Sequence, residues 1–592
     1  MGATAQQEEE EIVGRAYDAR LMKRLLTYLT PYRTVIAGSG TLLILTSGLE
    51  VLRPYLLMVA IDSYIVPARL EGLWGLALLY LGILALGGGV QYGQLFLTHW
   101  TGQRVMADLR LEIFRHLKRL PLRYFDRNPA GRIFTRVTSD VENLKELFTS
   151  GLVSAIGDLL TAAAIVAAML YLDLKLSLIA FAIIPLLITA VTLFQKKARG
   201  AYRLIRQKVS RLNASLQESL NGMEVIQAFG REEAMATRFA GVNAEHREAT
   251  LRSLLYYALF YPAVEVIAAV GLGLIIWYGG GQVVRETITL GVLVAFLEYL
   301  QRFFTPIKDL SEKYYVMQSA MASSERIFDL LDEPPEPDGN GYRMRSLRGA
   351  IEFRDVWFAY RPGEHILKGL SFTVEPGERV ALIGATGAGK STVVNLLTRL
   401  YEIERGAILV DGRDIRGLDL TALRQRIGLI PQDPFLFSES LATNLQVGHG
   451  VSPEEVNRSL ELAGAAPVVE RLPAGLQTRL TERGASLSMG ERQLIGLARA
   501  MVYAPDILIL DEATSNVDPA TEAEFSRRLR HLTAGKTLII IAHRLQSAAE
   551  ADRILVLHHG ELLEKGTHQE LLARQGLYAR LWYLQHDGSP HS

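Results

Sequence analysis

The apolar residues of this chain are distributed unevenly, and the long apolar runs fall almost entirely before residue 320. Six of these runs, at residues 35–64, 73–97, 152–172, 176–194, 255–278 and 290–316, reach about the length of a spanning helix. A helix needs roughly 20 apolar residues to cross the hydrocarbon core of a bilayer. The pattern therefore predicts a six-helix, all-α transmembrane domain, preceded at residues 19–34 by an amphipathic helix on the membrane surface.

Charged residues in the loops predict the topology of these spans. The loops after the second and fourth spans are long and rich in Arg and Lys, whereas those on the opposite side are short and almost uncharged. By the positive-inside rule, both long loops and both termini face the cytoplasm, in a multi-pass protein of the cytoplasmic (inner) membrane. The N-terminus also lacks the pattern of a cleaved signal peptide.

The two long loops keep helical periodicity, with breaks at residues 128–131 and 221–222. We expect the membrane helices to continue into the cytosol and to meet at a short turn at each tip. The alternative is a pair of solvated helical hairpins without a partner.

The second half of the chain has a different pattern, in which short β-branched runs alternate with helical segments, as in an α/β domain. A stretch rich in Pro, Gly and acidic residues precedes it. The predicted organisation is an acidic tail at 1–18, a transmembrane domain at 19–318, a linker at 319–350, an α/β domain at 351–585 and a tail at 586–592.

Composition removes several classes of function. The 63 basic and 63 acidic residues cancel, so the net charge gives no support for nucleic-acid binding. Cysteine is absent, which excludes disulfides and thiolate metal sites.

Residues 384–391 (GATGAGKS) match the phosphate-loop pattern G-x-x-x-x-G-K-[ST] between an apolar strand and a helix. Gly384, Gly387 and Gly389 would let backbone amides wrap phosphates. Lys390 would neutralise the β and γ oxygens, and the Ser391 hydroxyl would bind Mg²⁺.

A strand with an acidic end is predicted further along the chain, where the apolar run 507–510 is followed by Asp511 and Glu512. Asp511 is suited to hold magnesium, and Glu512 to orient or deprotonate an attacking water. A pair of acids after a strand can also be a helix cap, and only the phosphate loop elsewhere in the chain favours the catalytic interpretation.

The order of motifs resembles the nucleotide-binding domain of an ATP-binding cassette (ABC) protein. After the phosphate loop come Gln432 in LIPQDPFLF, the turn 487–491, ILILDEAT, residues 515–518 and His543 in IIIAHR. With six spans in front, residues 20–585 resemble a half-size ABC exporter of the multidrug, lipid or peptide type. The combination is similar to one half of the heterodimeric bacterial exporters of thermophiles.

The resemblance implies ATP and Mg²⁺ as cofactors and a role for each motif residue. Tyr360 would stack on adenine, although a tyrosine at a strand end can also pack within its own domain. Turns at 128–136 and 221–229 would be coupling helices that dock on nucleotide domains. The expected nucleotide-binding residues are Tyr360, Gly384, Thr386, Gly387, Gly389, Lys390, Ser391, Thr392, Gln432, Ser488, Gly490 and Asp518. The expected magnesium ligands are Ser391, Gln432 and Asp511, and the expected catalytic residues are Lys390, Gln432, Glu512 and His543.

One motif departs from the family, in which the turn reads LSGGQ and closes on ATP held by the partner chain. Here it reads LSMGE, so Met489 replaces a glycine and Glu491 brings a carboxylate near an anion. Two like charges ~4 Å apart repel by up to about 4 kcal/mol at an effective dielectric of about 20. The resemblance therefore implies a second, unlike half-transporter and two unequal ATP sites, with a homodimer as the alternative.

The expected activity is ATP-driven export of hydrophobic or amphipathic substrates (drugs, peptides or lipids) across the cytoplasmic membrane by alternating access, with the lipid bilayer as surroundings. A lipid or lipopolysaccharide floppase and a non-pumping membrane regulator remain alternatives. Ionisable residues inside predicted spans are costly and often mark a substrate path, although they can also pair with one another. These residues are Arg53, Asp158, Glu265, Glu298 and Arg302.

Overall fold

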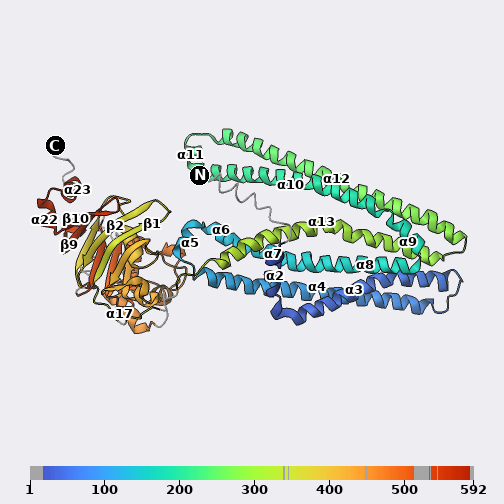
Figure 1. Ribbon diagram of the computed structural model, residues 1–592, viewed down its shortest axis with the longest axis horizontal. Helices are drawn as coiled ribbons and strands as arrows, with labels where there is room; N and C mark the ends of the chain where they lie inside the picture. Colours follow the sequence, from blue (N-terminus) through green and yellow to red (C-terminus); the bar gives the residue numbers. More distant parts are fainter. Residues whose placement is uncertain are drawn as a thin grey trace. The chain divides into compact units, whose positions relative to one another are not determined.

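The computed structural model describes residues 18–337, 341–344, 346–446, 451–511, 532–533, 535–542 and 545–586. The chain divides into two compact units (Figure 1). Unit 1 comprises Met1–Lys118 and Ala130–Glu333, and unit 2 comprises Arg119–Pro129 and Pro334–Ser592.

Unit 1 is helical throughout its described part. Its short elements are α2 (Ala19–Thr27), α6 (Ala130–Thr135), α7 (Val141–Glu146), α9 (Leu174–Phe181) and α11 (Met223–Ala228). Its long helices are α3 (Arg33–Ala60), α4 (Leu73–Leu117), α8 (Ser154–Leu172), α10 (Ile184–Asn221), α12 (Glu232–Val284) and α13 (Leu290–Asp332). Three π-helical segments, η2 (Ile61–Ile65), η3 (Arg136–Asp140) and η4 (Leu147–Val153), interrupt them.

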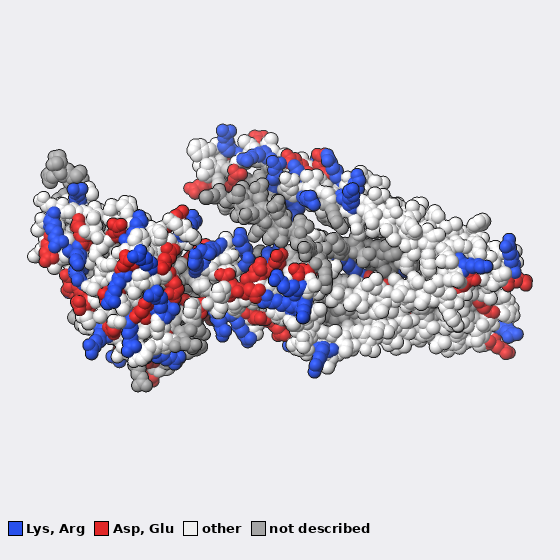
Figure 2. Space-filling model, in the orientation of Figure 1, with Lys and Arg blue, Asp and Glu red and all other residues white. Residues whose placement is uncertain are grey.

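Within the described residues, five helical stretches are long and apolar enough to cross a membrane, and each contains one of the first five predicted spans. They are Thr30–Ile65, Leu73–Leu117, Ala130–Leu172, Leu174–Asn221 and Glu232–Val284. The sixth predicted span lies in α13, which is not among these five, and the side chains of 305–312 and 314–315 lie outside the described residues. On the face shown in Figure 2, a wide band of unit 1 carries almost no charged residue.

The predicted helix at residues 19–34 forms as α2, which packs against other helices of unit 1. Met22 and Leu25 are buried, and the Arg24 guanidinium makes two hydrogen bonds of 2.7 Å with the Asp332 carboxylate at the end of α13. Arg24 also lies over the Phe328 ring, 4.2 Å from its centroid. The apolar stripe of this amphipathic helix is therefore at least partly covered by protein.

Unit 2 contains two sheets. An antiparallel sheet has the order β2-β1-β4-β5, with β1 (Ile351–Ala359), β2 (His365–Val374), β4 (Arg405–Val410) and β5 (Arg413–Asp414). A mainly parallel sheet has the order β10-β9-β3-β8-β7-β6, with β3 (Arg379–Ile383), β6 (Ile427–Ile430), β7 (Ile507–Asp511), β8 (Thr537–Ile541), β9 (Arg553–His558) and β10 (Glu561–Gly566). The longer helices are α14 (Lys390–Leu397), α17 (Pro453–Ala463), α19 (Met489–Met501) and α23 (Leu577–His586), and the shorter ones are α5 (Leu122–Arg127), α15 (Leu420–Arg426), α16 (Leu441–Leu445), α18 (Ala466–Glu470), α21 (Leu545–Ala549) and α22 (His568–Ala573).

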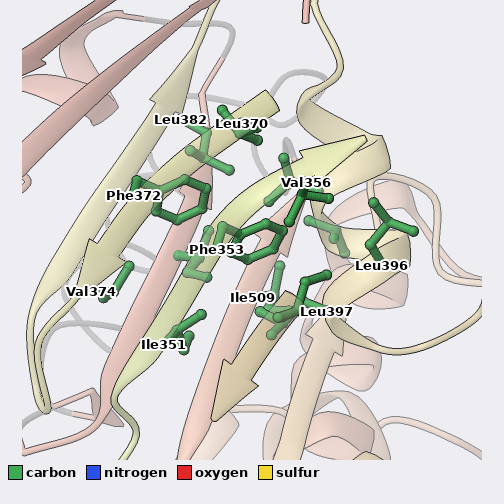
Figure 3. Close-up of a cluster of buried hydrophobic side chains, with 14 of the residues drawn as sticks. Ile351, Phe353, Val356, Leu370, Phe372, Val374, Leu382, Leu396, Leu397 and Ile509 are labelled. Carbon is green, nitrogen blue, oxygen red and sulfur yellow. The ribbon is translucent and has the colours of Figure 1, made fainter. Parts of the chain in front are cut away.

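The core of unit 2 lies between these sheets and α14 (Figure 3). Phe353 of β1 and Phe372 of β2 face each other in register, and their rings stack with centroids 4.5 Å apart. Leu382 of β3 and Ile509 of β7 come from the parallel sheet and are fully buried. This packing fixes β3 and β7, and parallel strands present their carboxyl ends at one edge, where ligands bind.

The fold class is confirmed, and two boundaries differ from the sequence-based expectation. Helix α13 continues to Asp332, so the predicted linker at 319–350 begins with helix, because its first 14 residues contain neither Gly nor Pro. The predicted break near residue 128 is present, but the segment that groups with unit 2 is Arg119–Pro129, largely upstream of the predicted coupling turn at 128–136. Pro129 separates α5 from α6, which belongs to unit 1.

Candidate nucleotide site

The phosphate loop connects β3 to α14, and three of its glycines are required by its shape. Gly384 has φ +155°, and a Cβ there would lie 2.3 Å from the Leu557 carbonyl oxygen. Gly389 has φ +100°, and a Cβ there would lie 2.7 Å from a methyl of Leu367. Gly387 has φ +83° with open space around it, so its requirement is conformational.

Lys390 begins α14 and is 6% exposed. Its ammonium donates hydrogen bonds to the carbonyl oxygens of Gly384 at 2.8 Å and Ala385 at 3.2 Å. Burial lowers the pKa of Lys390, and the negative charge of Asp511 opposes that shift. The loop therefore holds a lysine at its centre whose charge Asp511 helps to maintain.

The oxygen donors at this edge of the sheet fit magnesium. Ser391 is exposed in the first turn of α14, and Asp511 is half-buried at the end of β7. No group of three His, Asp or Glu suited to a metal occurs among the described residues. Mg²⁺ typically takes one or two protein oxygens and fills its octahedron with phosphate and water, so a site with few protein ligands is suitable. Gln432, the third predicted ligand, is exposed in the loop after β6.

Tyr360 lies just after β1, and its hydroxyl is tied to the helix that carries the phosphate loop. Asn395 of α14 donates to the Tyr360 oxygen at 3.2 Å, and that hydroxyl lies 3.3 Å from Thr392 Oγ1. The ring is half-buried and perpendicular to the rings of Phe358 and Tyr401, with centroids 4.8 Å and 5.0 Å away. The predicted adenine platform and the predicted phosphate-loop residue Thr392 are therefore brought together.

Sequence reasoning missed Tyr401, which follows the phosphate-loop helix. Its hydroxyl donates a hydrogen bond to the Asp126 carboxylate of α5, 275 positions away in the chain. The only local signal was an aromatic residue close after α14.

The predicted signature turn, residues 487–491, begins α19 as a capping box. The Glu491 amide donates to the Ser488 hydroxyl at 3.3 Å, and the Ser488 amide donates to Glu491 Oε2 at 2.8 Å. The other carboxylate oxygen, Oε1, accepts a 2.8 Å bond from Arg471. Glu491 therefore caps its own helix and has a cationic partner, which reduces the charge repulsion expected from the sequence. Met489 and Gly490 occupy the first turn, both half-buried.

The capping role predicts how two substitutions of Glu491 differ in stability. Glu491→Gln should keep the bond from the Ser488 amide and lose only the half-exposed pair with Arg471, at a cost below about 1 kcal/mol. Glu491→Ala should lose both, with the loss of the cap adding about 1 kcal/mol. Thermal unfolding of the two purified variants measures the difference, and equal midpoints would contradict the capping role.

The intramembrane ionisable residues are mostly paired within unit 1. The Glu50 carboxylate binds Arg53 at 2.8 Å and also Arg302, and Arg302 lies 3.7 Å from Glu298. Asp158 of α8 pairs with Lys313 of α13. The sequence did not single out the partners Glu50 and Lys313.

Glu265 is exposed on α12. The other predicted residues, Glu512, Asp518 and His543, lie outside the described part of the chain. Thr386 is exposed in the phosphate loop.

Comparison with protein families gives two matches. Residues 36–307 match the family model described as ABC transporter transmembrane region, and residues 367–515 match the one described as ABC transporter. The first match spans most of the helical unit 1 together with Arg119–Pro129 of unit 2, and the second spans most of β2 and all of β3 to β7.

Individual relatives match over nearly the whole chain. The chain is 38% identical to YknV, an uncharacterized ABC transporter ATP-binding protein of Bacillus subtilis, over 98% of this chain and 96% of the relative. It is 36% identical to an ATP-dependent lipid A-core flippase of Thiobacillus denitrificans, over 95% and 98%. A solved bacterial Atm1-family ABC exporter with ATP bound superposes with a TM-score of 0.77 at 29% identity, over 94% and 99% of the two chains.

The phosphate loop, the capped signature helix and the acidic strand end follow one another in the order found in ABC ATPases, behind a multi-pass helical unit. The chain therefore belongs to the ABC transporter family, as a half-size exporter that carries one transmembrane domain and one transport-coupled ATPase domain.

Proposed function

We propose that this chain is the catalytically intact half of a heterodimeric ABC exporter, which moves hydrophobic or amphipathic compounds across the cytoplasmic membrane by alternating access. The observation that carries the proposal is a mismatch between two half-sites. The phosphate loop is complete around Lys390 and Asp511, whereas the signature turn has Met489 and Glu491 where the family has glycine and glutamine.

In the competent site, this chain supplies the phosphate loop, the magnesium ligands Ser391, Gln432 and Asp511, the water-orienting Glu512 and the γ-phosphate contact His543. A partner chain supplies its own signature turn. Bound Mg²⁺ neutralises charge that develops on the transferred phosphate.

In the other site, Ser488 and Gly490 of this chain face ATP that is held on the partner's phosphate loop, and Asp518 lies at the interface. Arg471 offsets the Glu491 charge, so the larger handicap is Met489, whose side chain occupies space that the family leaves to a glycine. ATP bound there is mainly held and not hydrolysed.

The heterodimer is tested by expressing the chain with its native operon and by purifying it alone. Mass spectrometry of the co-purified material should find a second ABC half-transporter, and the chain alone should have little ATPase activity. Robust ATPase activity of this chain as a homodimer would refute the unlike partner.

The substrate class rests on the relatives, whose names include a probable multidrug resistance transporter, a fatty acid transporter and the lipid A-core flippase. Inverted vesicles that contain the assembled complex should take up a fluorescent drug or peptide when ATP is added. Movement of a labelled lipid alone would favour the floppase alternative, and movement of nothing would favour a regulator. Protease protection should place both termini in the cytoplasm.

Tyr360→Leu should weaken binding of MgATP to this chain by roughly fivefold to tenfold, since base–aromatic stacking contributes about 1 kcal/mol or more. The leucine keeps an apolar side chain at the end of β1 but removes the planar face. Fluorescence titration with a labelled ATP analogue measures the change. An unchanged affinity would show that Tyr360 packs within its domain and does not bind the base. Tyr583→Leu, at an exposed position of α23, is the matched control.

A further inference from the structure

Helix α5 and the residues around it are held in unit 2 by hydrogen bonds. The residues around it, Arg119–Pro129, belong to unit 2 although unit 1 precedes and follows them in sequence. The Tyr401 hydroxyl donates to Asp126 of α5, and the Glu336 amide donates to the Arg119 carbonyl at 2.7 Å. Tyr401, which follows α14, thus contacts a residue of α5 and lies next to Tyr360 of the candidate nucleotide site.

The Tyr401 ring also contacts the expected base platform. It lies perpendicular to Tyr360, with centroids 5.0 Å apart, and at 65° to Phe358, with centroids 5.8 Å apart. Perpendicular aromatic pairs have a preferred geometry, so a shift of one ring is transmitted to the other. One side chain therefore contacts Tyr360 with its ring and Asp126 with its hydroxyl.

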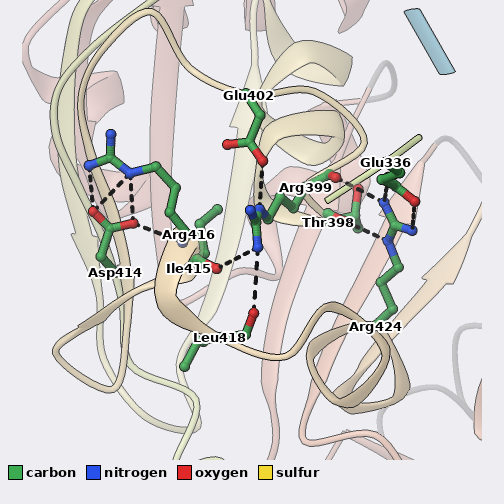
Figure 4. Close-up of polar contacts among 9 residues, drawn as sticks. All are labelled: Glu336, Thr398, Arg399, Glu402, Asp414, Ile415, Arg416, Leu418 and Arg424. Atoms are coloured by element: carbon green, nitrogen blue, oxygen red, sulfur yellow. Dashed lines mark hydrogen bonds and ion pairs between the residues drawn. The ribbon is translucent and has the colours of Figure 1, made fainter. Parts of the chain in front are cut away.

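The backbone before Tyr401 is held firmly (Figure 4). Arg424 donates to the carbonyls of Thr398 at 3.1 Å and Arg399 at 2.9 Å, and it pairs with Glu336 at 2.7 Å. The buried Arg399 side chain binds Glu402 at 2.7 Å and the Ile415 carbonyl at 3.3 Å. Because this turn is fixed at several points, it is poorly able to absorb a displacement of the Tyr401 ring by moving its backbone.

The Tyr401 hydroxyl stays a donor at neutral pH. Burial and the hydrogen bond to Asp126 raise the pKa of Tyr401 above its usual range. Asp126 is exposed, and its carboxylate is the acceptor.

We propose that Tyr401 is a positioning residue that links base stacking on Tyr360 to the docking of α5 on the ATPase domain. This proposal rests on the proposed role of Tyr360 as the adenine platform. By linkage, a base that orders Tyr360 stabilises the Tyr401–Asp126 contact, and docking of α5 favours base binding by the same factor. The proposed signal is specific to the base, because it starts from stacking of the adenine on the Tyr360 ring.

The test is hydrogen exchange of the amides at 122–127 in the full-length protein in lipid nanodiscs. The non-hydrolysable analogue AMP-PNP with Mg²⁺ should slow exchange there by about fivefold or more in the wild-type protein, the lower end of ordinary coupling factors. Inorganic tripolyphosphate, which has no base, should have little effect. Tyr401→Phe keeps the ring and removes the hydroxyl, so it should reduce the AMP-PNP effect to below about twofold at saturating ligand.

The variants distinguish a linking role from a merely structural one. By the same linkage, the AMP-PNP affinity of Tyr401→Phe should fall by no more than the coupling factor of about fivefold. Tyr583→Phe, which removes an exposed hydroxyl on α23, should behave as wild type. Asp126→Ala should reproduce the Tyr401→Phe effect, and the double variant should be no worse than either single one.

Three results would overturn the proposal. If AMP-PNP slows exchange in α5 of Tyr401→Phe as much as in the wild type, the Tyr401 hydroxyl does not link the base to the docking of α5. If tripolyphosphate slows exchange in α5 as much as AMP-PNP does, stacking of the base is not what stabilises the docking of α5. Additive effects of Tyr401→Phe and Asp126→Ala show that the pair does not act together. If instead Tyr360→Leu binds AMP-PNP with wild-type affinity, the proposed role of Tyr360 as the adenine platform is wrong. This failure is distinguishable from that of the Tyr401 proposal, because it is seen in the nucleotide affinity and not in the hydrogen exchange of α5.

Discussion

Lys390→Ala is expected to lower the ATPase rate of the assembled exporter by at least about 100-fold, the usual cost of removing one preorganised donor from a transition state. The ammonium is nearly buried in a loop of backbone amides, held by the carbonyls of Gly384 and Ala385. The attraction between the ammonium and the phosphate oxygens is stronger at a buried position than in water, because the effective dielectric is lower there. Alanine removes the positive charge and leaves the phosphate oxygens without their cation.

Lys565→Ala is the matched control. This substitution also removes one positive charge from the ATPase domain, but at an exposed position of β10. Steady-state ATPase assays and nucleotide titration of both variants separate loss of catalysis from loss of binding. ATPase activity of Lys390→Ala within tenfold of wild type would contradict the assigned phosphate contact. Hydrogen exchange across unit 2 establishes that the variant is folded.

Local patterns were enough to predict the α/β character of unit 2 and the strand-loop-helix context of the phosphate loop. The apolar run 507–510 is continuous because the strand is buried on both faces, and Asp511 is the last residue of β7. The break between α5 and α6 was also visible, because Asn128 and Pro129 end a helix by local chemistry.

Contacts between distant residues were not visible in the sequence. Asp126 and Tyr401 meet only when the chain folds, and each has an unremarkable local pattern. Glu491 was recognised as a carboxylate near an anion, but its compensating partner Arg471 lies 20 positions away on a different element. Likewise, Arg53 and Arg302 were singled out as costly charges, whereas the Glu50 carboxylate between them passed unnoticed. In the last two cases the sequence located a charge, and the fold supplied its counter-ion.

Glu512→Gln is expected to abolish nearly all ATP turnover of the complex, by about 100-fold to 10,000-fold, the range of general-base catalysis. Glutamine keeps the size and a hydrogen-bonding oxygen but cannot accept a proton from the attacking water. ATP binding should persist, since Lys390, Ser391 and Asp511 are unchanged. The matched control is Glu561→Gln, which neutralises an exposed carboxylate of β10.

The size of this loss also measures the asymmetry between the two sites. If the site served by Met489 and Glu491 hydrolysed ATP normally, removal of Glu512 would leave a substantial fraction of the turnover, carried by the partner's phosphate loop. If that site mainly holds its nucleotide, almost nothing remains, and a complex trapped with radiolabelled ATP should retain it in both sites. Residual turnover near half of wild type would refute the unequal pair and point to two equivalent sites, whereas near-normal turnover would refute the water-orienting role of Glu512.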